Sequence, residues 1–219
     1  MEKYFDILKD LSLFEGMTSK DILEMMTCFA AKTESYSKGS YIRIEGDSAD
    51  FIGIVLDGSI QILKDDYNGN RNITSAFGPG QLFAEAFACA AVPSLPVSIL
   101  AATDSIILFI NIQKILYPCT NACYFHSKLI QNLLKIVSRK NMLLNKKLSY
   151  VSHKTTSEKL MAFLHDQAKE NNSLEFTIPY NRQALADYLG VERSALSAEI
   201  GKLQKQGVLE TKRSYFKLH

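Results

Sequence analysis

Short hydrophobic segments alternate with turn residues through the first half of the chain, from Tyr36 onward. The segments are Tyr41–Ile44, Phe51–Leu56, Ser59–Leu63, Val97–Leu100 and Ser105–Ile110, with a polar loop over 65–70. Regular short strands separated by turn signals are typical of an antiparallel sandwich or barrel. Ahead of them, Thr18 and Asp21 fit a capping box that predicts a helix around residues 19–30. We therefore expect a β-rich domain over residues 1–111.

The apolar positions take up helical spacing at residue 112. Residues 112–148 lack glycine and contain a single proline, Pro118, so they predict one long helix. Its apolar positions step by three and four, at Ile130, Leu133, Val137 and Leu144, and its charges are all positive. A symmetric dimer would cover this stripe, so we expect a homodimer through residues 124–148. The alternative is that the stripe packs on the chain's own sheet.

The helical period breaks over residues 149–154, which predicts a hinge. Directly after it, Thr155 and Glu158 form a second capping box and predict a helix that ends at Asn171-Asn172-Ser173. We expect a separate C-terminal domain over residues 155–219.

Residues 181–207 have the spacing of two short helices joined by a tight turn at Gly190, which is typical of a helix-turn-helix. The positions predicted to be buried are Leu185, Leu189, Leu196, Ile200 and Leu203. The outer face of the second helix carries small or hydrogen-bonding residues that can approach base edges in a major groove, namely Arg193, Ser194, Ser197 and Ala198. Val208–Glu210 and Tyr215–Leu218 predict a terminal hairpin, and the whole is typical of a winged helix.

Charge is segregated along the chain, although the formal net charge is only +2. Residues 1–111 hold 8 Lys/Arg against 15 Asp/Glu, whereas residues 112–153 hold 7 Lys/Arg and no acid. In the last nineteen residues, basic side chains suited to phosphate outnumber Glu210, among them Lys202, Lys212 and Arg213. Double-stranded DNA is therefore the expected partner of the C-terminal end, and the acidic first half is not a nucleic-acid surface.

The composition excludes some locations. No apolar run reaches membrane-spanning length, and the first residues lack the apolar block of a secretion signal, so we expect a cytoplasmic chain with no membrane partner. The four cysteines, at 28, 89, 119 and 123, show no paired spacing of a disulfide framework. Cys119 and Cys123 lie four apart and suit either a metal or redox pair or, as we expect, simple packing.

Taken in order, these elements resemble the CRP/FNR family of bacterial transcription regulators. The resemblance covers essentially the whole chain and depends on the order of short segments. They are Leu13-Phe14, Tyr36-Ser37-Lys38-Gly39, Ile44-Glu45-Gly46-Asp47, Val55-Leu56-Asp57-Gly58, Gly78-Pro79-Gly80, Phe83-Ala84-Glu85, Ala101-Ala102-Thr103-Asp104 and the helix-turn-helix. The family implies an α+β architecture with a double-stranded β-helix (jelly-roll) effector domain, a long dimerisation helix and a C-terminal winged helix-turn-helix under effector control.

The resemblance also assigns DNA contacts. Asn181, Arg182 and Gln183 fall where the family has a Thr-Arg-Gln that contacts phosphates. Arg193 matches an arginine that reads a guanine edge, a bidentate pairing. Ser194 stands where many members carry a base-reading glutamate, and Ala198 where they carry a second arginine. The resemblance thus implies an operator different from that of the cyclic-AMP receptor.

The predicted effector pocket departs from that of cyclic-nucleotide binders. There, a Gly-Glu meets the ribose and an Arg-Ser grips the phosphate, whereas this chain has Ala84-Glu85 and Leu95-Pro96. No arginine or lysine lies between Arg71 and Lys114, and a buried phosphate without a cation is costly to desolvate. We expect a small hydrophobic or aromatic effector, or none, in place of cyclic AMP or cyclic GMP. The residues assigned to the pocket are Leu82, Phe83, Ala84, Glu85, Ala86, Phe87, Leu95, Pro96, Val97 and Ser98, with Asn141, Leu144 and Asn145 from the long helix.

Sensors and enzymes that depend on a cofactor or a metal fit the residues of this chain less well. An iron–sulfur sensor needs an N-terminal cysteine cluster, but Cys28 is the only cysteine before Cys89. A haem sensor or a metal-dependent cupin enzyme needs histidine ligands, and no histidine precedes His126. We therefore expect no cofactor, no metal site and no catalytic residue.

Some alternatives stay open at this point. The winged helix can serve protein contacts with the dimer as a scaffold. Arg193 can pair with Glu192 or Glu199 on the surface, and Glu85 can bond backbone amides instead of a ligand. In the regulator interpretation, an effector held by residues 80–98 and the long helix favours the placement of two winged helices that fits half-sites about 34 Å apart. Activation would also require contact with RNA polymerase.

Overall fold

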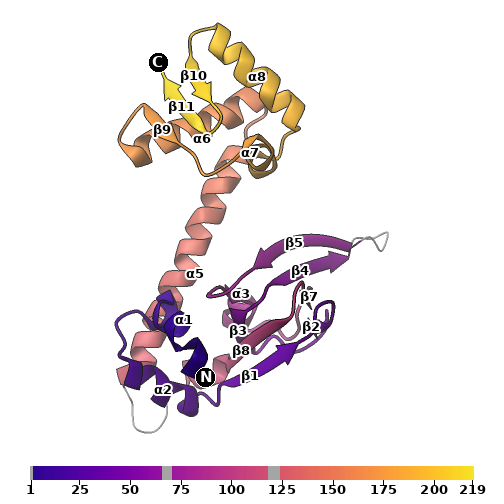
Figure 1. The fold of residues 1–219 in the computed structure, drawn as a ribbon, viewed down its shortest axis with the longest axis vertical. Coiled ribbons are helices and arrows are strands. Elements are labelled where there is room, and N and C mark those ends of the chain that lie inside the picture. The colour runs from indigo at the N-terminus through magenta and orange to yellow at the C-terminus, as the bar shows by residue number, and fades with distance from the viewer. Residues whose placement is uncertain (1, 66–70, 118–123) are drawn as a thin grey trace. The chain divides into compact units, whose positions relative to one another are not determined.

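Figure 1 shows the computed structural model, which describes residues 2–65, 71–117 and 124–219. The chain divides between Ser138 and Arg139 into two units, and this boundary falls inside helix α5, Tyr124–Val151. The first unit holds the β-rich part of the sequence, and the second holds the helix-turn-helix.

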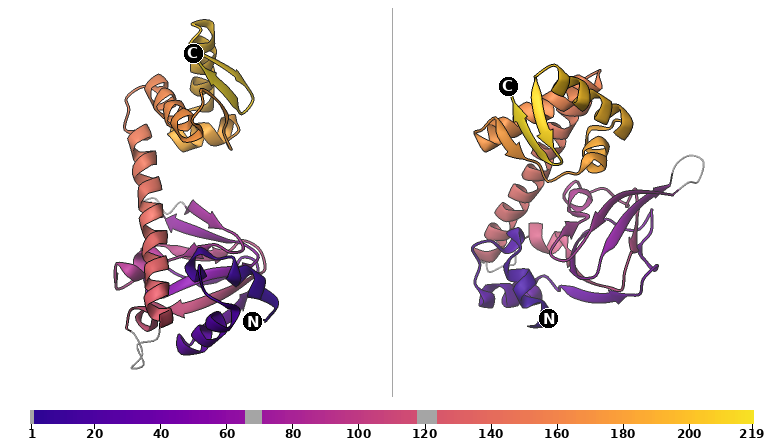
Figure 2. Two further views of the ribbon diagram at one scale, coloured as in Figure 1. Left: turned by 90° about the vertical axis from the view of Figure 1, so that its left-hand side faces the viewer. Right: turned by 45° about the horizontal axis from the view of Figure 1, so that its top comes forward.

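Two four-stranded antiparallel sheets face one another in the first unit (Figure 2), with strand orders β1-β8-β3-β6 and β2-β7-β4-β5. The strands are β1 (Lys32–Tyr36), β2 (Tyr41–Arg43), β3 (Phe51–Asp57), β4 (Ile60–Asp65), β5 (Arg71–Phe77), β6 (Leu82–Phe83), β7 (Ser98–Ala101) and β8 (Ser105–Asn111). The predicted jelly roll is confirmed, and the five predicted apolar segments coincide with β2, β3, β4, β7 and β8. The predicted loop 65–70 lies outside the described residues except for Asp65, which ends β4.

Helices cover the outer face of the first sheet, where they share a core with the outward side of β3 and β8. They include α1 (Phe5–Lys9), α2 (Ser19–Cys28), α3 (Glu85–Cys89) and α4 (Ile112–Leu116), with short 3-10 turns at Glu2–Tyr4 and Ser12–Phe14. The capping box at the start of α2 is confirmed, because Thr18 Oγ1 accepts from the Asp21 amide at 3.3 Å and the Asp21 carboxylate accepts from the Thr18 amide at 2.8 Å.

The predicted single helix over 112–148 is wrong at its first part, where α4 ends at Leu116 and α5 begins at Tyr124. Tyr117 has extended backbone angles, with φ −103° and ψ 100°. The cause is Pro118, since a residue that precedes proline is disfavoured in the helical region. Residues 118–123 lie outside the described part of the chain, and the hypotheses about Cys119 and Cys123 lie there with them.

Three of the four positions in the stripe predicted for dimerisation pack inside the first unit. Leu133 is only 4% exposed, and Ile130 and Val137 pack partly buried against the same core. Asn132 fixes the helix there by donating to the carbonyls of Leu13 and Glu15 at 3.0 and 2.9 Å. These positions therefore pack inside the chain, but against a core that the N-terminal helices share with the sheet and not against the sheet alone.

The predicted hinge at residues 149–154 is also shorter than expected, since α5 continues to Val151. Tyr150 is 2% exposed and its hydroxyl donates to Asp166 Oδ2 at 2.9 Å. The ring packs edge-on against Phe163 with centroids 5.6 Å apart. This packing holds the end of α5 in helical form, and only residues 152–155 separate it from the next helix.

The second unit is a winged helix with helices α6 (Thr156–Asn171), α7 (Arg182–Leu189) and α8 (Arg193–Lys205). A small antiparallel sheet has the order β10-β11-β9, with β9 (Glu175–Thr177), β10 (Leu209–Lys212) and β11 (Tyr215–Leu218). The second capping box is confirmed, as Thr155 Oγ1 accepts from the Glu158 amide at 3.1 Å. Among the described residues, no helix is long and apolar enough to cross a membrane.

Candidate DNA-binding interface

The helix-turn-helix is built as the sequence predicts. Asn181 caps α7, its Oδ1 accepting from the Ala184 amide at 2.9 Å, and Gly190 ends α7 with a left-handed φ of 61°. All five positions predicted to be buried lie in the core of the second unit. This register leaves Arg193, Ser194, Ser197 and Ala198 exposed on one side of α8.

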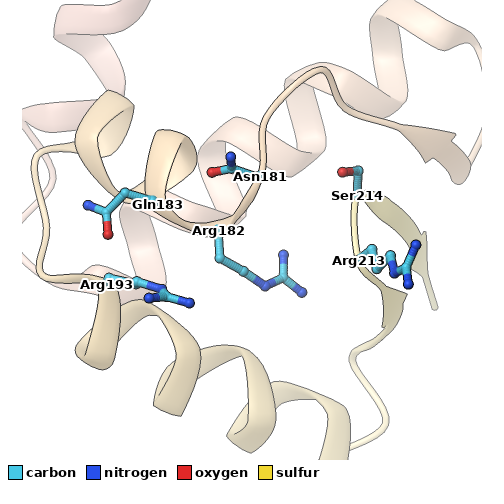
Figure 3. A pocket seen from close by; sticks show the side chains of 6 residues that line it. All are labelled: Asn181, Arg182, Gln183, Arg193, Arg213 and Ser214. Carbon is cyan, nitrogen blue, oxygen red and sulfur yellow. The ribbon is translucent and has the colours of Figure 1, made fainter.

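A cavity of about 550 Å³ opens between the start of α7, the start of α8 and the hairpin β10–β11. It is lined by Asn181, Arg182, Gln183, Arg193, Arg213 and Ser214. Figure 3 shows Arg182 extending from α7 toward this space, Arg193 at the start of α8, and Arg213 on the hairpin. Three guanidinium groups and no carboxylate among the lining residues make this cavity suited to an anion such as a phosphate.

Arg182 is partly engaged within the protein. Its Nη2 donates to Thr211 Oγ1 at 3.0 Å, and Thr211 Oγ1 in turn donates to the Tyr215 carbonyl at 2.7 Å. The guanidinium carbon lies 5.0 Å from the centre of the Phe216 ring, and burial lowers the pKa of Arg182 from its ordinary value. Arg182 therefore ties the wing to α7, in addition to lining the cavity.

Arg193 is free of the ion pairs that the sequence left open, within the part of the chain that the structure describes. Glu199 pairs instead with Lys202, its oxygen 3.4 Å from Nζ. Lys202 thus forms a surface ion pair, which contributes little to stability, and it remains on the solvent side of α8.

The wing carries Lys212 and Arg213, both exposed at the turn between β10 and β11. Arg213 has a φ of +56°, a left-handed conformation that non-glycine residues rarely adopt. Ser214, which the sequence did not single out, lines the cavity and donates through Oγ to the Tyr180 carbonyl at 3.2 Å. The sequence signal that could have identified Ser214 as a lining residue is its position in the turn of a basic hairpin. Gln183 Nε2 donates to Asp187 at 2.8 Å, on the first turns of α7.

The residues assigned to the effector pocket divide between core and surface. Leu82, Phe83, Leu95 and Val97 are buried in the hydrophobic cores of the first unit, whereas Ala86 and Pro96 are exposed and Ala84, Phe87 and Ser98 are half-buried. Glu85 is 4% exposed at the start of α3, and it has interaction partners within the protein. The three helix residues, Asn141, Leu144 and Asn145, are exposed on α5 in the second unit.

Phe83 fills the space over Gly53 in the neighbouring strand. A Cβ added at Gly53 would lie 2.1 Å from Phe83 Cζ. Around the Phe83 ring stand Phe51, Phe77 and Phe109, with centroids 6.3, 6.3 and 6.5 Å away. The segment expected to hold an effector thus supplies core side chains between the two sheets.

A cation that the sequence did not assign lies beside these rings. The guanidinium carbon of Arg43, in β2, is 4.5 Å from the centre of the Phe109 ring and 5.3 Å from that of Phe51. Arg43 also pairs with Glu34 at 3.9 Å. A second cavity, of about 490 Å³, is lined by Ile42, Arg43, Asp47, Ser48, Asp50 and Phe51. Arg43 lies outside the stretch between Arg71 and Lys114 that lacks cations in the sequence, and only the fold brings β2 beside these rings.

Comparisons with known proteins agree with this architecture. Residues 33–118 match the cyclic nucleotide-binding domain family, and residues 158–219 match the Crp-like helix-turn-helix domain family. The chain is 22% identical over 215 residues to the anaerobic regulatory protein of Haemophilus influenzae, covering 90% of this chain and 76% of that protein. It resembles the solved structure of the catabolite activator protein of Thermus thermophilus with a TM-score of 0.52 and 18% identity, covering 95% of this chain and 93% of that one. It also resembles DNR from Pseudomonas aeruginosa with a TM-score of 0.53 and 17% identity, covering 100% of this chain and 95% of that one.

Proposed function

The chain belongs to the CRP/FNR family of DNA-binding transcription regulators, and we propose that it binds a DNA sequence of its own as a homodimer. The observation that carries this proposal is the basic cavity between α7, α8 and the wing. It places three arginines where a phosphate and an adjoining base edge can be contacted together. The family function is regulation of transcription, and no enzyme activity is part of the proposal.

Base reading falls to α8. Arg193 lies on the first turn of the helix with its guanidinium exposed, which suits a bidentate bond to guanine O6 and N7. Ser194, Ser197 and Ala198 lie on the same exposed side, and two of them are shorter than the glutamate and the second arginine that the resemblance assigns to positions 194 and 198. Fewer base contacts near Arg193 support an operator that differs from that of the cyclic-AMP receptor.

Residues suited to phosphate contacts lie beside the base-reading side of α8. Asn181 and Gln183 lie at the start of α7, and Lys212 and Arg213 lie on the wing, so two separate elements flank α8. Lys202 adds a cation on the side of α8. Contacts of this kind fix the protein on the duplex without reading sequence.

We infer a dimer through α5 and control by an effector that is not a cyclic nucleotide. The dimer is supported by large apolar side chains exposed on α5, among them Leu134, Leu144 and Leu148. The effector class is supported by Leu95 and Pro96, an uncharged pair that stands where the resemblance assigns a phosphate-gripping Arg-Ser. Phe83 would have to move for a ligand to enter between the sheets. If the protein activates transcription, RNA polymerase is its further partner in the cytoplasm.

The DNA-binding proposal is tested by selecting genomic fragments and measuring binding by fluorescence anisotropy at several salt concentrations. Wild-type protein is expected to retain particular fragments, with an affinity that falls as salt rises. Arg193→Ala is expected to weaken the selected site about 10- to 100-fold while leaving nonspecific binding nearly unchanged. Arg71→Ala is the matched control, because Arg71 is a surface arginine of the first unit.

Two outcomes would contradict the proposal. Selectivity that survives in Arg193→Ala would remove Arg193 as the base reader. Failure of the wild type to retain any fragment at low salt would favour the alternative in which the winged helix contacts protein. For the effector, native mass spectrometry of the purified dimer is expected to find no cyclic nucleotide, and a stoichiometric one would overturn that part.

A further inference from the structure

The second cavity of the first unit combines charged groups of both signs. It is the cavity of about 490 Å³ lined by Ile42, Arg43, Asp47, Ser48, Asp50 and Phe51, and we call it the Arg43 cavity. Its lining comes from one stretch of the chain, which runs from β2 through the following loop to the start of β3. Because one guanidinium and two carboxylates line the cavity, a ligand that matches them carries one negative group and two positive groups.

Arg43 is held in place and still keeps donors for a ligand. Its guanidinium lies over two phenylalanine rings, and its Nη1 donates to the Ile42 carbonyl at 2.6 Å and to the Tyr36 hydroxyl at 3.2 Å. The ion pair with Glu34, at 3.9 Å, also uses Nη1. Within the described residues, Nε and Nη2 of Arg43 make no hydrogen bond. These two nitrogens form an edge of the guanidinium that can bind a carboxylate through two parallel bonds.

Each carboxylate of the Arg43 cavity also keeps an oxygen for a ligand. Asp47 Oδ2 accepts from the Ile44 amide at 2.9 Å, and Asp50 Oδ2 accepts from Asn111 Nδ2 at 3.3 Å. Neither Oδ1 has a hydrogen-bond partner among the residues that the structure describes, and neither carboxylate forms an ion pair there. Two carboxylates with a spare acceptor each are suited to two ammonium groups of one ligand.

The loop that carries these groups is already fixed by backbone hydrogen bonds. The Gly46 amide donates to the Leu95 carbonyl at 2.9 Å, and the Leu95 amide donates to the Asp47 carbonyl at 2.8 Å. At the end of the loop, the Ile112 amide donates to the Asp50 carbonyl at 2.9 Å. Binding therefore requires little further ordering of the chain, which favours the affinity for a small ligand.

We propose that the Arg43 cavity binds a basic amino acid of the lysine class. The α-carboxylate accepts from Nε and Nη2 of Arg43, and the α-ammonium and side-chain ammonium groups donate to Asp47 and Asp50. The two carboxylates of the cavity repel a ligand that carries only negative charge, so a basic amino acid fits better than an inorganic phosphate or a cyclic nucleotide. This inference goes beyond the proposed function, because DNA binding by the second unit does not depend on it.

Isothermal titration calorimetry of the full chain with L-lysine tests the site. The wild type is expected to bind one L-lysine per chain. Three analogues each lack one charged group: norleucine lacks the side-chain ammonium, ε-aminocaproate lacks the α-ammonium, and cadaverine lacks the carboxylate. Each analogue should bind about 10- to 100-fold more weakly than L-lysine, because it loses a charge-assisted hydrogen bond.

Two variants test the assigned residues. Arg43→Gln and Asp50→Asn should each weaken L-lysine binding about 10- to 100-fold, and Asp50→Asn keeps an acceptor for Asn111. Asp10→Asn, the same change at an exposed acid of the first unit outside the cavity lining, is the matched control and should bind like the wild type.

Three outcomes would overturn the proposal. They are failure of the wild type to bind L-lysine, binding of cadaverine as tight as that of L-lysine, and unchanged binding in Asp50→Asn, which decides the matter even if Arg43→Gln does not fold. DNA binding is judged separately by Arg193→Ala, so failure of the amino-acid site and failure of the proposed function are distinguishable.

Discussion

Replacing Gly53 by alanine tests whether Phe83 truly closes the space between the two sheets. Gly53 lies in β3 and pairs with Phe83 of β6 on one side and with Phe109 of β8 on the other. The new Cβ would lie 2.1, 2.4 and 2.5 Å from three atoms of the Phe83 ring. Non-bonded carbon atoms do not approach one another this closely, so the ring or the strand must shift.

The magnitude follows from two opposing effects. Alanine in place of glycine stabilises by about 0.4–1 kcal/mol through the unfolded chain when the native backbone suits it. Overpacking a buried site costs about 1–3 kcal/mol, and the Phe83 ring has Phe51, Phe77 and Phe109 around it and little room to swing. The clash therefore falls in the upper half of that range, and the net loss of unfolding free energy is about 1–2.5 kcal/mol.

The assay is a double-mutant cycle of Gly53→Ala, Phe83→Ala and the double variant in the full chain. Unfolding in denaturant is monitored locally, by hydrogen exchange in peptides from β3 and β6, because a protein of two units does not unfold in one step. Phe83→Ala alone should cost about 3–5 kcal/mol, and in the double variant the clash disappears, so the two losses should fall short of additivity by more than about 1 kcal/mol. Losses that add within about 0.5 kcal/mol would refute the close packing of Phe83 on Gly53.

Two further predictions concern the wing. Arg213→Gly should raise the stability of the second unit by about 1 kcal/mol, because glycine adopts the φ of +56° without strain. The same substitution should reduce the salt slope of DNA binding by about one, since it removes one phosphate contact. Unfolding measures the first effect and anisotropy titrations the second, and an unchanged slope would remove Arg213 from the phosphate contacts. Arg182→Lys keeps the charge but loses the planar group that bonds Thr211 and stacks on Phe216, so hydrogen exchange in β10 and β11 should accelerate while the salt slope stays near that of the wild type. Unchanged protection of the hairpin would contradict the tie between Arg182 and the wing.

Features that depend on neighbouring residues in the sequence were predicted well. The capping boxes at Thr18 and Thr155 and the left-handed turn at Gly190 follow from local hydrogen bonding and backbone freedom, and all three are confirmed. The buried face of α8 was predicted because the helical period alone decides which side chains share a face. The exposed positions from Arg193 to Ala198 followed from the same register.

Features that depend on residues far apart in the sequence were not predicted, or were predicted with a different role. Strand β5 is polar and largely exposed along its length, so it gives no alternating signal and forms only because β4 pairs with it. Tyr150 looked like part of a break in the helical pattern, but Asp166 and Phe163 turn it into a buried anchor. Leu133 looked available for a partner helix until the N-terminal helices covered it. Arg43 entered the aromatic cluster only through the fold.

The position of the unit boundary has a consequence for how the two DNA-reading helices are spaced. Asn141, Leu144 and Leu148 lie after Ser138, in the same unit as α8. Within that unit Tyr150 bonds Asp166, Lys146 pairs with Glu170, and Lys147 lies over the Tyr188 ring at 5.3 Å, so the end of α5 and the winged helix form one packed body. The proposed dimer, if it pairs through these exposed residues of α5, would therefore fix the separation of its two α8 helices through contacts inside the second unit alone.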